Sequence, residues 1–347
     1  MPFSRCAGWS HMTRGFFAAM LLAVTTVAAN HATAEIIRKE DMVRGIRMTR
    51  EECDARPQTL WLNVYDRNFC VRYYLSNAGG ESTRPIVILN GDSGSAIDLK
   101  RWQWKNPSEA KDVDTDKFGP SAERFSKMAK TTAIYIARIG VEGSSGSHLA
   151  RKTVLEVNLM DVALDALQKR YKFEGFHLIG QSGGGRLIFG LAEMRRDIGC
   201  LISTSGGLVN NPGQSRFGDP GKTYFKIDDD NIRFLKRNRD LRIIVISDPE
   251  DKAVPVATRQ APMVDALRDE GHKVLHLDVE TTDPKRHGAL WTYGKVAMSG
   301  CVNGKSDDEI TQAIDKVVDR TVEIKQRREN EARNKPMSEM ASGTERR

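Results

Sequence analysis

Short apolar segments alternate with longer amphipathic ones along most of the chain. Near-continuous apolar segments predict strands that are covered on both faces, at 85–89, 133–137, 176–179, 200–203, 241–246 and 273–278. Two more strands are predicted ahead of them, at 59–65 and 69–75, after a polar helical stretch from 35 to 50. Apolar residues at helical spacing predict helices at 122–130, 154–171, 186–195, 231–237, 260–270 and 307–329.

This alternation predicts an α/β protein with a mainly parallel central sheet, helices on both of its faces and antiparallel strands at the start. One domain, 35–330, accommodates the whole pattern. We expect no large cap domain, because 208–240 contains two Pro-Gly turns and one short helical segment. The tail, 331–347, offers nothing to bury and is predicted to be disordered.

The amino end has the pattern of a cleavable export signal. Arg14 precedes an apolar run, 15–29, and Ala32-Thr-Ala34 follows it with the small-x-small spacing of a cleavage site. The run is shorter than the roughly 20 residues that span a bilayer. We therefore expect cleavage after Ala34, a periplasmic or secreted protein, and no stable membrane insertion afterwards. Either Met1 or Met12 can be the start.

Four cysteines remain after the predicted cleavage: Cys53, Cys70, Cys200 and Cys301. Disulfides persist in exported proteins, and four cysteines allow three pairings. Cys53 and Cys70 flank a strand-rich stretch that a hairpin can fold back, so we favour Cys53–Cys70 with Cys200–Cys301. Buried free thiols are the alternative.

The net charge of +7 and pI of about 9.1 first suggest a nucleic-acid partner. Two of these charges lie before residue 35 and three lie in 325–347, which leaves about two for the body. A nucleic-acid-binding domain concentrates basic residues on its folded part, whereas this body mixes both signs. We therefore expect no nucleic-acid partner.

A strand, a glycine-rich turn and a helix follow one another between 176 and 189. Within this segment, 180–184 reads Gly-Gln-Ser-Gly-Gly and fits G-x-S-x-G, the sharp turn that lifts a serine hydroxyl above a sheet. Flanking glycines let the helix approach the strand, and the helix directs its first N–H groups at the negative charge of acyl transfer. Ser182 is therefore the candidate nucleophile.

A serine nucleophile needs an imidazole to take its proton and a carboxylate to orient that imidazole. In this type of fold the chain order is serine, acid, histidine, with the last two after late strands. Asp251 follows the strand 241–246, and His287 follows the strand 273–278. Asp248 and Glu250 compete for the role of the acid, but Asp251 lies furthest along the turn.

The other histidines fit this order less well. His272 and His276 lie just before and inside the last strand, and we interpret them as packed or surface residues. His148 and His177 precede the serine. We interpret His148 as part of a solvent-exposed loop, with a substrate contact as the alternative.

An oxyanion hole requires two backbone donors. One is expected at the N–H of Gly183, directly after the nucleophile, and the other at Asp92 in the loop after strand 85–89, with Ser93 as the alternative. The Asp92 carboxylate would oppose an oxyanion unless its side chain turns away. An ordinary glycine turn also explains this loop and is compatible with the same backbone donors.

Together these residues resemble the α/β-hydrolase superfamily over about 84–290. The resemblance rests on 180–184, on His287 and on 251–255, Asp-Lys-Ala-Val-Pro, which is similar to the common D-x-x-V-P acid loop. The loop 138–146 is similar to that of the peptidase and esterase branch related to prolyl oligopeptidases and dienelactone hydrolases. There are two departures: Asn90-Gly91 replaces the usual His-Gly, and no propeller segment precedes the hydrolase part.

The resemblance implies the α/β-hydrolase fold and a serine hydrolase, carboxylesterase or peptidase-like, that forms an acyl-enzyme from a small-molecule ester or a short peptide. Neither a metal nor an organic cofactor is expected. The alternative is a catalytically silent binding protein of the same fold, which a degenerate triad would indicate. The sequence predicts neither the choice between ester and peptide nor the oligomeric state.

Overall fold

The computed structural model describes residues 36–92, 97–98, 103–104, 112–206, 238 and 241–333. Four sequence predictions therefore lie wholly or almost wholly outside the described residues: the signal peptide at 1–34, the absence of a cap at 208–240, the helix at 231–237, and most of the tail.

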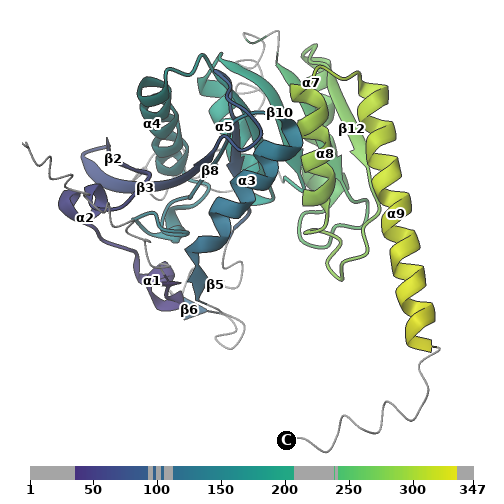
Figure 1. The fold of residues 1–347 in the computed structure, drawn as a ribbon, viewed down its shortest axis with the longest axis horizontal. Helices are drawn as coiled ribbons and strands as arrows, with labels where there is room; N and C mark the ends of the chain where they lie inside the picture. The colour runs from purple at the N-terminus through teal and green to yellow at the C-terminus, as the bar shows by residue number, and fades with distance from the viewer. Residues whose placement is uncertain are drawn as a thin grey trace, which may run out of the picture. The chain divides into compact units, whose positions relative to one another are not determined.

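The described residues form an eight-stranded sheet in the order β12-β11-β10-β9-β4-β8-β3-β2 (Figure 1). β2 pairs antiparallel with β3, and β3 with β8, whereas all the other neighbours in this sheet are parallel. The predicted mainly parallel sheet with antiparallel strands at the start is thus confirmed. The strands are β2 (Thr59–Val64), β3 (Arg67–Ser76), β4 (Ile86–Leu89), β8 (Ala133–Ile136), β9 (Phe176–Gln181), β10 (Ile198–Thr204), β11 (Arg242–Ser247) and β12 (Val274–Asp278).

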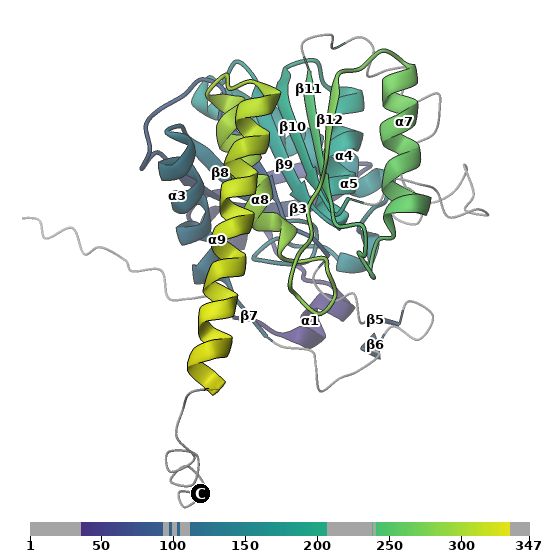
Figure 2. The same ribbon diagram turned by 90° about the vertical axis from the view of Figure 1, so that its right-hand side faces the viewer.

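Helices cover both faces of this sheet (Figure 2). In β4, Val87 and Leu89 face one core and Ile86 and Ile88 face the other, because successive side chains of a strand point to opposite faces. This is why the central strands read as continuous apolar runs. The first core is completed by α4 (Val154–Tyr171), α5 (Gly183–Met194) and α7 (Ala261–Asp269), and the second by α3 (Phe118–Ala129), α8 (Leu290–Val302) and α9 (Asp307–Arg333).

The segment before β2 is more broken than the single helical stretch that the sequence predicted. Gly45, at φ 93°, ends α1 after two turns. The short elements are β1 (Ile36–Ile37), α1 (Lys39–Arg44), α2 (Arg50–Asp54), β5 (Ile97–Asp98), β6 (Gln103–Trp104), β7 (Val113–Asp114), and the helical turns η1 (Thr115–Lys117), η2 (His148–Ala150) and η3 (Val256–Gln260).

Helix α8 was not predicted, because its glycines lower the helix propensity of the segment. The structure shows what these glycines allow. A Cβ at Gly294 would lie 2.5 Å from Thr204 Cγ2, and one at Gly300 would lie 2.5 Å from Ile310 Cγ1. The two glycines therefore let α8 approach both the sheet and α9 closely, and tertiary packing outweighs local propensity.

Helix α9 continues to Arg333, past the predicted domain boundary at 330. Its last turns are rich in Arg, Glu, Gln and Lys, which favour a helix without burial. Among the helices of the described ranges, none is long and apolar enough to cross a membrane.

Two disulfides are formed in the structure. Cys53 in α2 is joined to Cys70 in β3, and Cys200 in β10 is joined to Cys301 in α8. The favoured pairing is therefore confirmed over the alternative of free thiols. The second bond fastens α8 to β10, on the face of the sheet opposite α5.

His177 in β9 is a half-buried histidine that folding keeps neutral. Its Nδ1 accepts a hydrogen bond from the N–H of Cys200 at 3.1 Å, so this nitrogen carries no proton. Burial, and next the nearby charge of Arg84, lower the pKa of His177 to about 4, against 6.5 for the unperturbed side chain. The unfolded chain therefore binds a proton between pH 6.5 and pH 4 that the folded chain does not bind.

We expect this difference to destabilise the protein as the pH falls. Over that window the free energy of unfolding should drop by up to about 1.4 kcal/mol per pH unit on account of His177 alone. Asn at 177 can keep an acceptor near Cys200 but does not titrate. Urea unfolding at pH 7, 6 and 5 should therefore show a shallower pH dependence for His177→Asn than for the wild type. Parallel curves for the two proteins would contradict this prediction.

Candidate active site

The carboxyl ends of four parallel strands bring the sequence-predicted residues to one edge of the sheet. Asp92 follows β4, Ser182 follows β9, Asp251 follows β11 and His287 follows β12. In open α/β sheets this edge is where ligands bind.

Ser182 lies in a strained turn between β9 and α5. Its backbone has φ 52° and ψ −115°, a conformation that residues other than glycine rarely adopt. Its N–H donates to Thr204 O at 2.8 Å, and its side chain does not cap α5. A Cβ at Gly180 would lie 2.3 Å from Gly184 O, so glycine is required where the helix returns over the strand. The predicted strand, turn and helix are confirmed.

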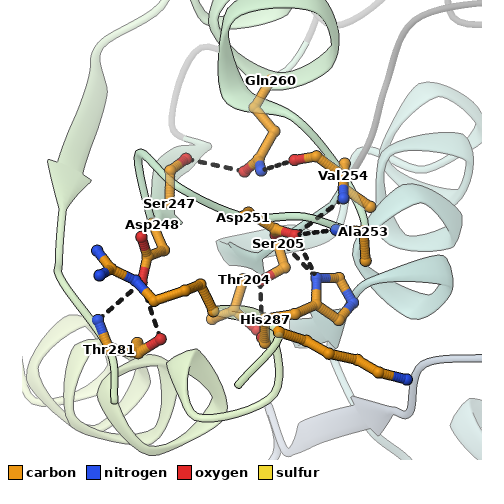
Figure 3. A network of polar contacts seen from close by, with 12 residues as sticks. Thr204, Ser205, Ser247, Asp248, Asp251, Ala253, Val254, Gln260, Thr281 and His287 are labelled. Carbon is orange, nitrogen blue, oxygen red and sulfur yellow. Dashed lines mark hydrogen bonds and ion pairs between the residues drawn. The ribbon is translucent and has the colours of Figure 1, made fainter. Parts of the chain in front are cut away.

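The Asp251 carboxylate holds the ring of His287 (Figure 3). Nδ1 of His287 donates to the two Asp251 oxygens at 2.8 and 3.0 Å. Asp251 Oδ1 also accepts the N–H groups of Ala253 and Val254, each at 2.8 Å, and the carboxylate is fully buried. With the proton on Nδ1, Nε2 is left as the basic nitrogen of the ring.

The two competing acids are directed elsewhere. Asp248 Oδ2 accepts the N–H of Thr281 at 2.7 Å and Nε–H of Arg286 at 2.8 Å. Glu250 is 71% exposed and pairs with Arg286 at 3.1 Å. Of the three candidates, the structure brings Asp251 to the histidine. Asp248 instead ties the turn that carries Asp251 to the loop that carries His287.

The backbones of Ser182 and His287 are held by adjacent residues at the end of β10. Thr204 O accepts the N–H of Ser182. Ser205 Oγ donates to His287 O at 2.9 Å (Figure 3). Asp283 adds a third contact, because its carboxylate accepts the N–H of His287 at 3.1 Å. The sequence reasoning missed Ser205 and Asp283. Only their positions, directly after a strand and four residues before the histidine, could have indicated them.

The loop after β4 lies against the Ser182 turn. A Cβ at Gly91 would be 3.2 Å from Ser182 Cβ, and one at Gly183 would be 2.0 Å from Asp92 Oδ1. The Asp92 side chain therefore does not turn away, as a free carboxylate beside an oxyanion would need to do, but packs against Gly183. Ser93, the alternative donor, lies outside the described residues.

Three cations surround the Asp92 carboxylate. Arg138 Nη1 lies at 2.8 Å, Lys152 Nζ at 2.6 Å and Arg151 Nε at 3.2 Å from its oxygens. Burial alone would raise the pKa of Asp92, but these charges outweigh burial and hold that pKa well below its usual range. The negative charge is thus compensated locally. The sequence reasoning missed all three cations, although Arg138 directly follows an apolar strand segment.

Asn90, which stands where the resemblance predicts a histidine, also has a defined partner. Its Nδ2 donates to Glu142 Oε1 at 3.3 Å. Glu142 is buried, and burial raises the pKa of its carboxyl group. The side chain of Asn90 is therefore drawn toward the loop after β8.

The prediction that His148 belongs to a solvent-exposed loop is wrong. Its side chain is fully buried, and Nδ1 donates to Ile139 O at 3.1 Å. The loop folds back over the sheet edge because Ser144 Oγ donates to Ala137 O and Ser145 N to Cys70 O. His276, predicted to be packed or at the surface, lies in β12 with Nε2 2.9 Å from Ser247 Oγ.

Within the described ranges, no three or more His, Cys, Asp or Glu side chains converge as metal ligands do.

Of three comparisons with known proteins, only the one with solved structures found matches. No protein-family model matches the chain, and no curated protein matches it. Among solved structures, an esterase of Pyrococcus furiosus matches with a TM-score of 0.51 at 12% identity, over 75% of this chain and 95% of that one. Est1E of Butyrivibrio proteoclasticus with ferulic acid bound (TM-score 0.47, 13% identity, 71% and 98%) and an α/β serine hydrolase homologue of Coxiella burnetii (0.45, 12%, 72% and 98%) are also similar.

At these identities the likeness shows the fold alone. That fold agrees with the strand order and helix layers described above, and it is the α/β-hydrolase fold that the sequence motifs implied.

Proposed function

We propose that this chain, which has the α/β-hydrolase fold, is an exported serine hydrolase that cleaves an ester or an amide through an acyl-enzyme. One observation carries the proposal. The buried Asp251 carboxylate accepts Nδ1–H of His287, at the sheet edge where Ser182 occupies its strained turn. This is the arrangement of acid and base that a serine nucleophile requires.

In this mechanism Ser182 Oγ attacks the substrate carbonyl carbon as His287 Nε2 takes its proton. The Asp251 carboxylate stabilises the imidazolium that results. The N–H groups of Gly183 and Asp92 donate to the oxyanion of the tetrahedral intermediate. The imidazolium then protonates the leaving alcohol or amine, which departs and leaves the acyl group on Ser182. A water molecule, activated by His287, repeats the sequence and releases the acid.

The substrate that we propose is a small-molecule ester or a short peptide. The name of the Pyrococcus furiosus neighbour, an esterase, supports an ester. Two disulfides and the amino-terminal signal pattern support export, because disulfides persist in oxidising compartments. The chemistry uses side chains and backbone of the chain itself.

A panel of chromogenic substrates tests this function. Purified protein would be mixed in stopped flow with 4-nitrophenyl esters of rising acyl length and with aminoacyl 4-nitroanilides. We expect ester hydrolysis with an initial burst of one nitrophenol per active site, the mark of an acyl-enzyme. If neither series is hydrolysed and no burst appears, the hydrolase proposal is contradicted and a silent binding protein is favoured.

A further inference from the structure

Arg138 connects the loop after β4 to helix α4. Its guanidinium is buried, with 1% of the side chain exposed, and all three of its nitrogens are used. Nε and Nη2 each donate to Glu156 at 2.9 Å, in a two-pronged pairing. Nη1 donates to Asn90 O at 3.1 Å and to Asp92 Oδ1 at 2.8 Å.

The two Nη1 contacts fall on either side of one peptide group. Asn90 O belongs to the peptide before Gly91, and Asp92 Oδ1 belongs to the residue after it. Between them lies the Gly91–Asp92 peptide, whose N–H is the second oxyanion donor in the proposed function. Gly91 has no side chain to restrict its backbone. The direction of this N–H therefore depends on anchors outside the glycine, and Arg138 supplies one on each side.

Glu156 gives the anchor a rigid base. It lies in the first turn of α4 and is fully buried, and its carboxylate pairs with two nitrogens of the planar guanidinium. Such pairing fixes the plane of an arginine, which a lysine cannot reproduce because its charge sits on a single ammonium.

The same cluster removes the electrostatic objection to a carboxylate beside the oxyanion. Asp92 Oδ1 pairs with Arg138, and Asp92 Oδ2 pairs with Arg151 and Lys152. Its charge is compensated within 3.2 Å, so the developing oxyanion meets little net repulsion.

We infer that Arg138 is a positioning residue for the oxyanion hole, which it orients by clamping Asn90 and Asp92 to Glu156. This inference rests on the proposed function. Arg138 does not touch the reacting atoms, so its loss should affect the transition state, where the oxyanion forms, more than substrate binding.

The test is the variant Arg138→Lys, which keeps the positive charge and loses the two-pronged pairing with Glu156. We expect kcat for a 4-nitrophenyl ester to fall by about 10- to 100-fold with KM changed less than about twofold, because removal of one oxyanion donor costs about 100- to 1,000-fold in kcat. The inhibition constant of an alkyl boronic acid, which forms a tetrahedral adduct on the serine, should rise by the same factor as kcat falls.

Arg195→Lys is the matched control. Arg195 is another buried arginine that holds several carboxylates, among them Asp161 and Asp197, at the opposite end of α5 from Ser182. We expect a comparable decrease in the urea midpoint for both variants but an unchanged kcat for Arg195→Lys. Equal losses of kcat in both variants, or an unchanged kcat in Arg138→Lys, would overturn the inference.

Asp92→Asn keeps the test decisive if Arg138→Lys does not fold. Asparagine retains the backbone N–H and the shape of the side chain but loses the attraction of the three cations. We expect kcat to fall about tenfold with KM unchanged. A rise in kcat would mean that the carboxylate opposes the oxyanion, and it would overturn the inference. A wild type without esterase activity would instead contradict the proposed function itself.

Discussion

Replacement of Ser182 by alanine is expected to lower kcat for ester hydrolysis by about 10⁶-fold, the loss that removal of a serine nucleophile causes in other triad enzymes. The hydroxyl is the group that would form the acyl-enzyme, so nothing in the remaining site can replace it. The fold should be unaffected. Both residues carry a Cβ, so the strain at φ 52° is unchanged, and the serine side chain does not cap α5. Stopped-flow kinetics and urea unfolding measure the two effects.

Ser126→Ala is the matched control for this substitution. Ser126 is fully buried in α3, and its Oγ accepts the N–H of Gly79 at 2.8 Å, away from the sheet edge that carries Ser182. We expect Ser126→Ala to lose stability but to keep the wild-type kcat. If Ser182→Ala retained more than a few per cent of wild-type kcat, another residue would have to be the nucleophile.

Asp251→Asn is expected to lower kcat by about 10⁴-fold with little change in KM. Asp251 Oδ1 accepts the N–H groups of Ala253 and Val254, so an asparagine would keep its carbonyl oxygen there. Its NH₂ group would then face His287 Nδ1 and donate to it. The imidazole proton would move to Nε2, which could no longer accept the proton of Ser182.

Two neighbouring acids serve as comparisons for Asp251→Asn. Glu250→Gln alters an exposed side chain and should leave kcat unchanged. Asp248→Asn weakens the buried pairing with Arg286 and should lower stability more than kcat. A loss of about 10⁴-fold in Asp248→Asn, with Asp251→Asn close to the wild type, would assign the acid to Asp248 instead.

The sequence predicted the parts of the site that depend on local structure and chain order. The turn at Ser182 is encoded within a few residues, because only glycines fit where α5 returns over β9. Asp251 and His287 follow from the order of strands along the chain, since parallel strands place their carboxyl ends at the same edge.

The surroundings of Asp92 could not be predicted in this way. Arg138, Arg151 and Lys152 lie more than 40 residues further along the chain. They meet the β4 loop only because β8 pairs beside β4 and α4 begins at the same edge. The sequence therefore indicated that a carboxylate would lie near the proposed oxyanion, but it did not indicate the cations that compensate its charge. For the same reason the sequence did not predict α8, whose glycines are explained only by its close contacts with β10 and α9.

The choice among the three acids after β11 also needed the tertiary structure. Asp248, Glu250 and Asp251 are close enough in sequence that any of them could reach a histidine. The loop after β12 distinguishes them. Thr281 and Arg286 of this loop donate hydrogen bonds to the Asp248 carboxylate, whereas His287 donates to Asp251.

Covalent labelling by a fluorophosphonate tests most directly whether Ser182 is an activated nucleophile. The purified wild type and Ser182→Ala would be treated with the probe, and the intact masses and the labelled peptides compared. We predict one adduct per wild-type chain, on the peptide that carries Ser182, and none on the variant. An adduct that persists in Ser182→Ala, or a folded wild type that takes up no probe, would contradict the proposed mechanism.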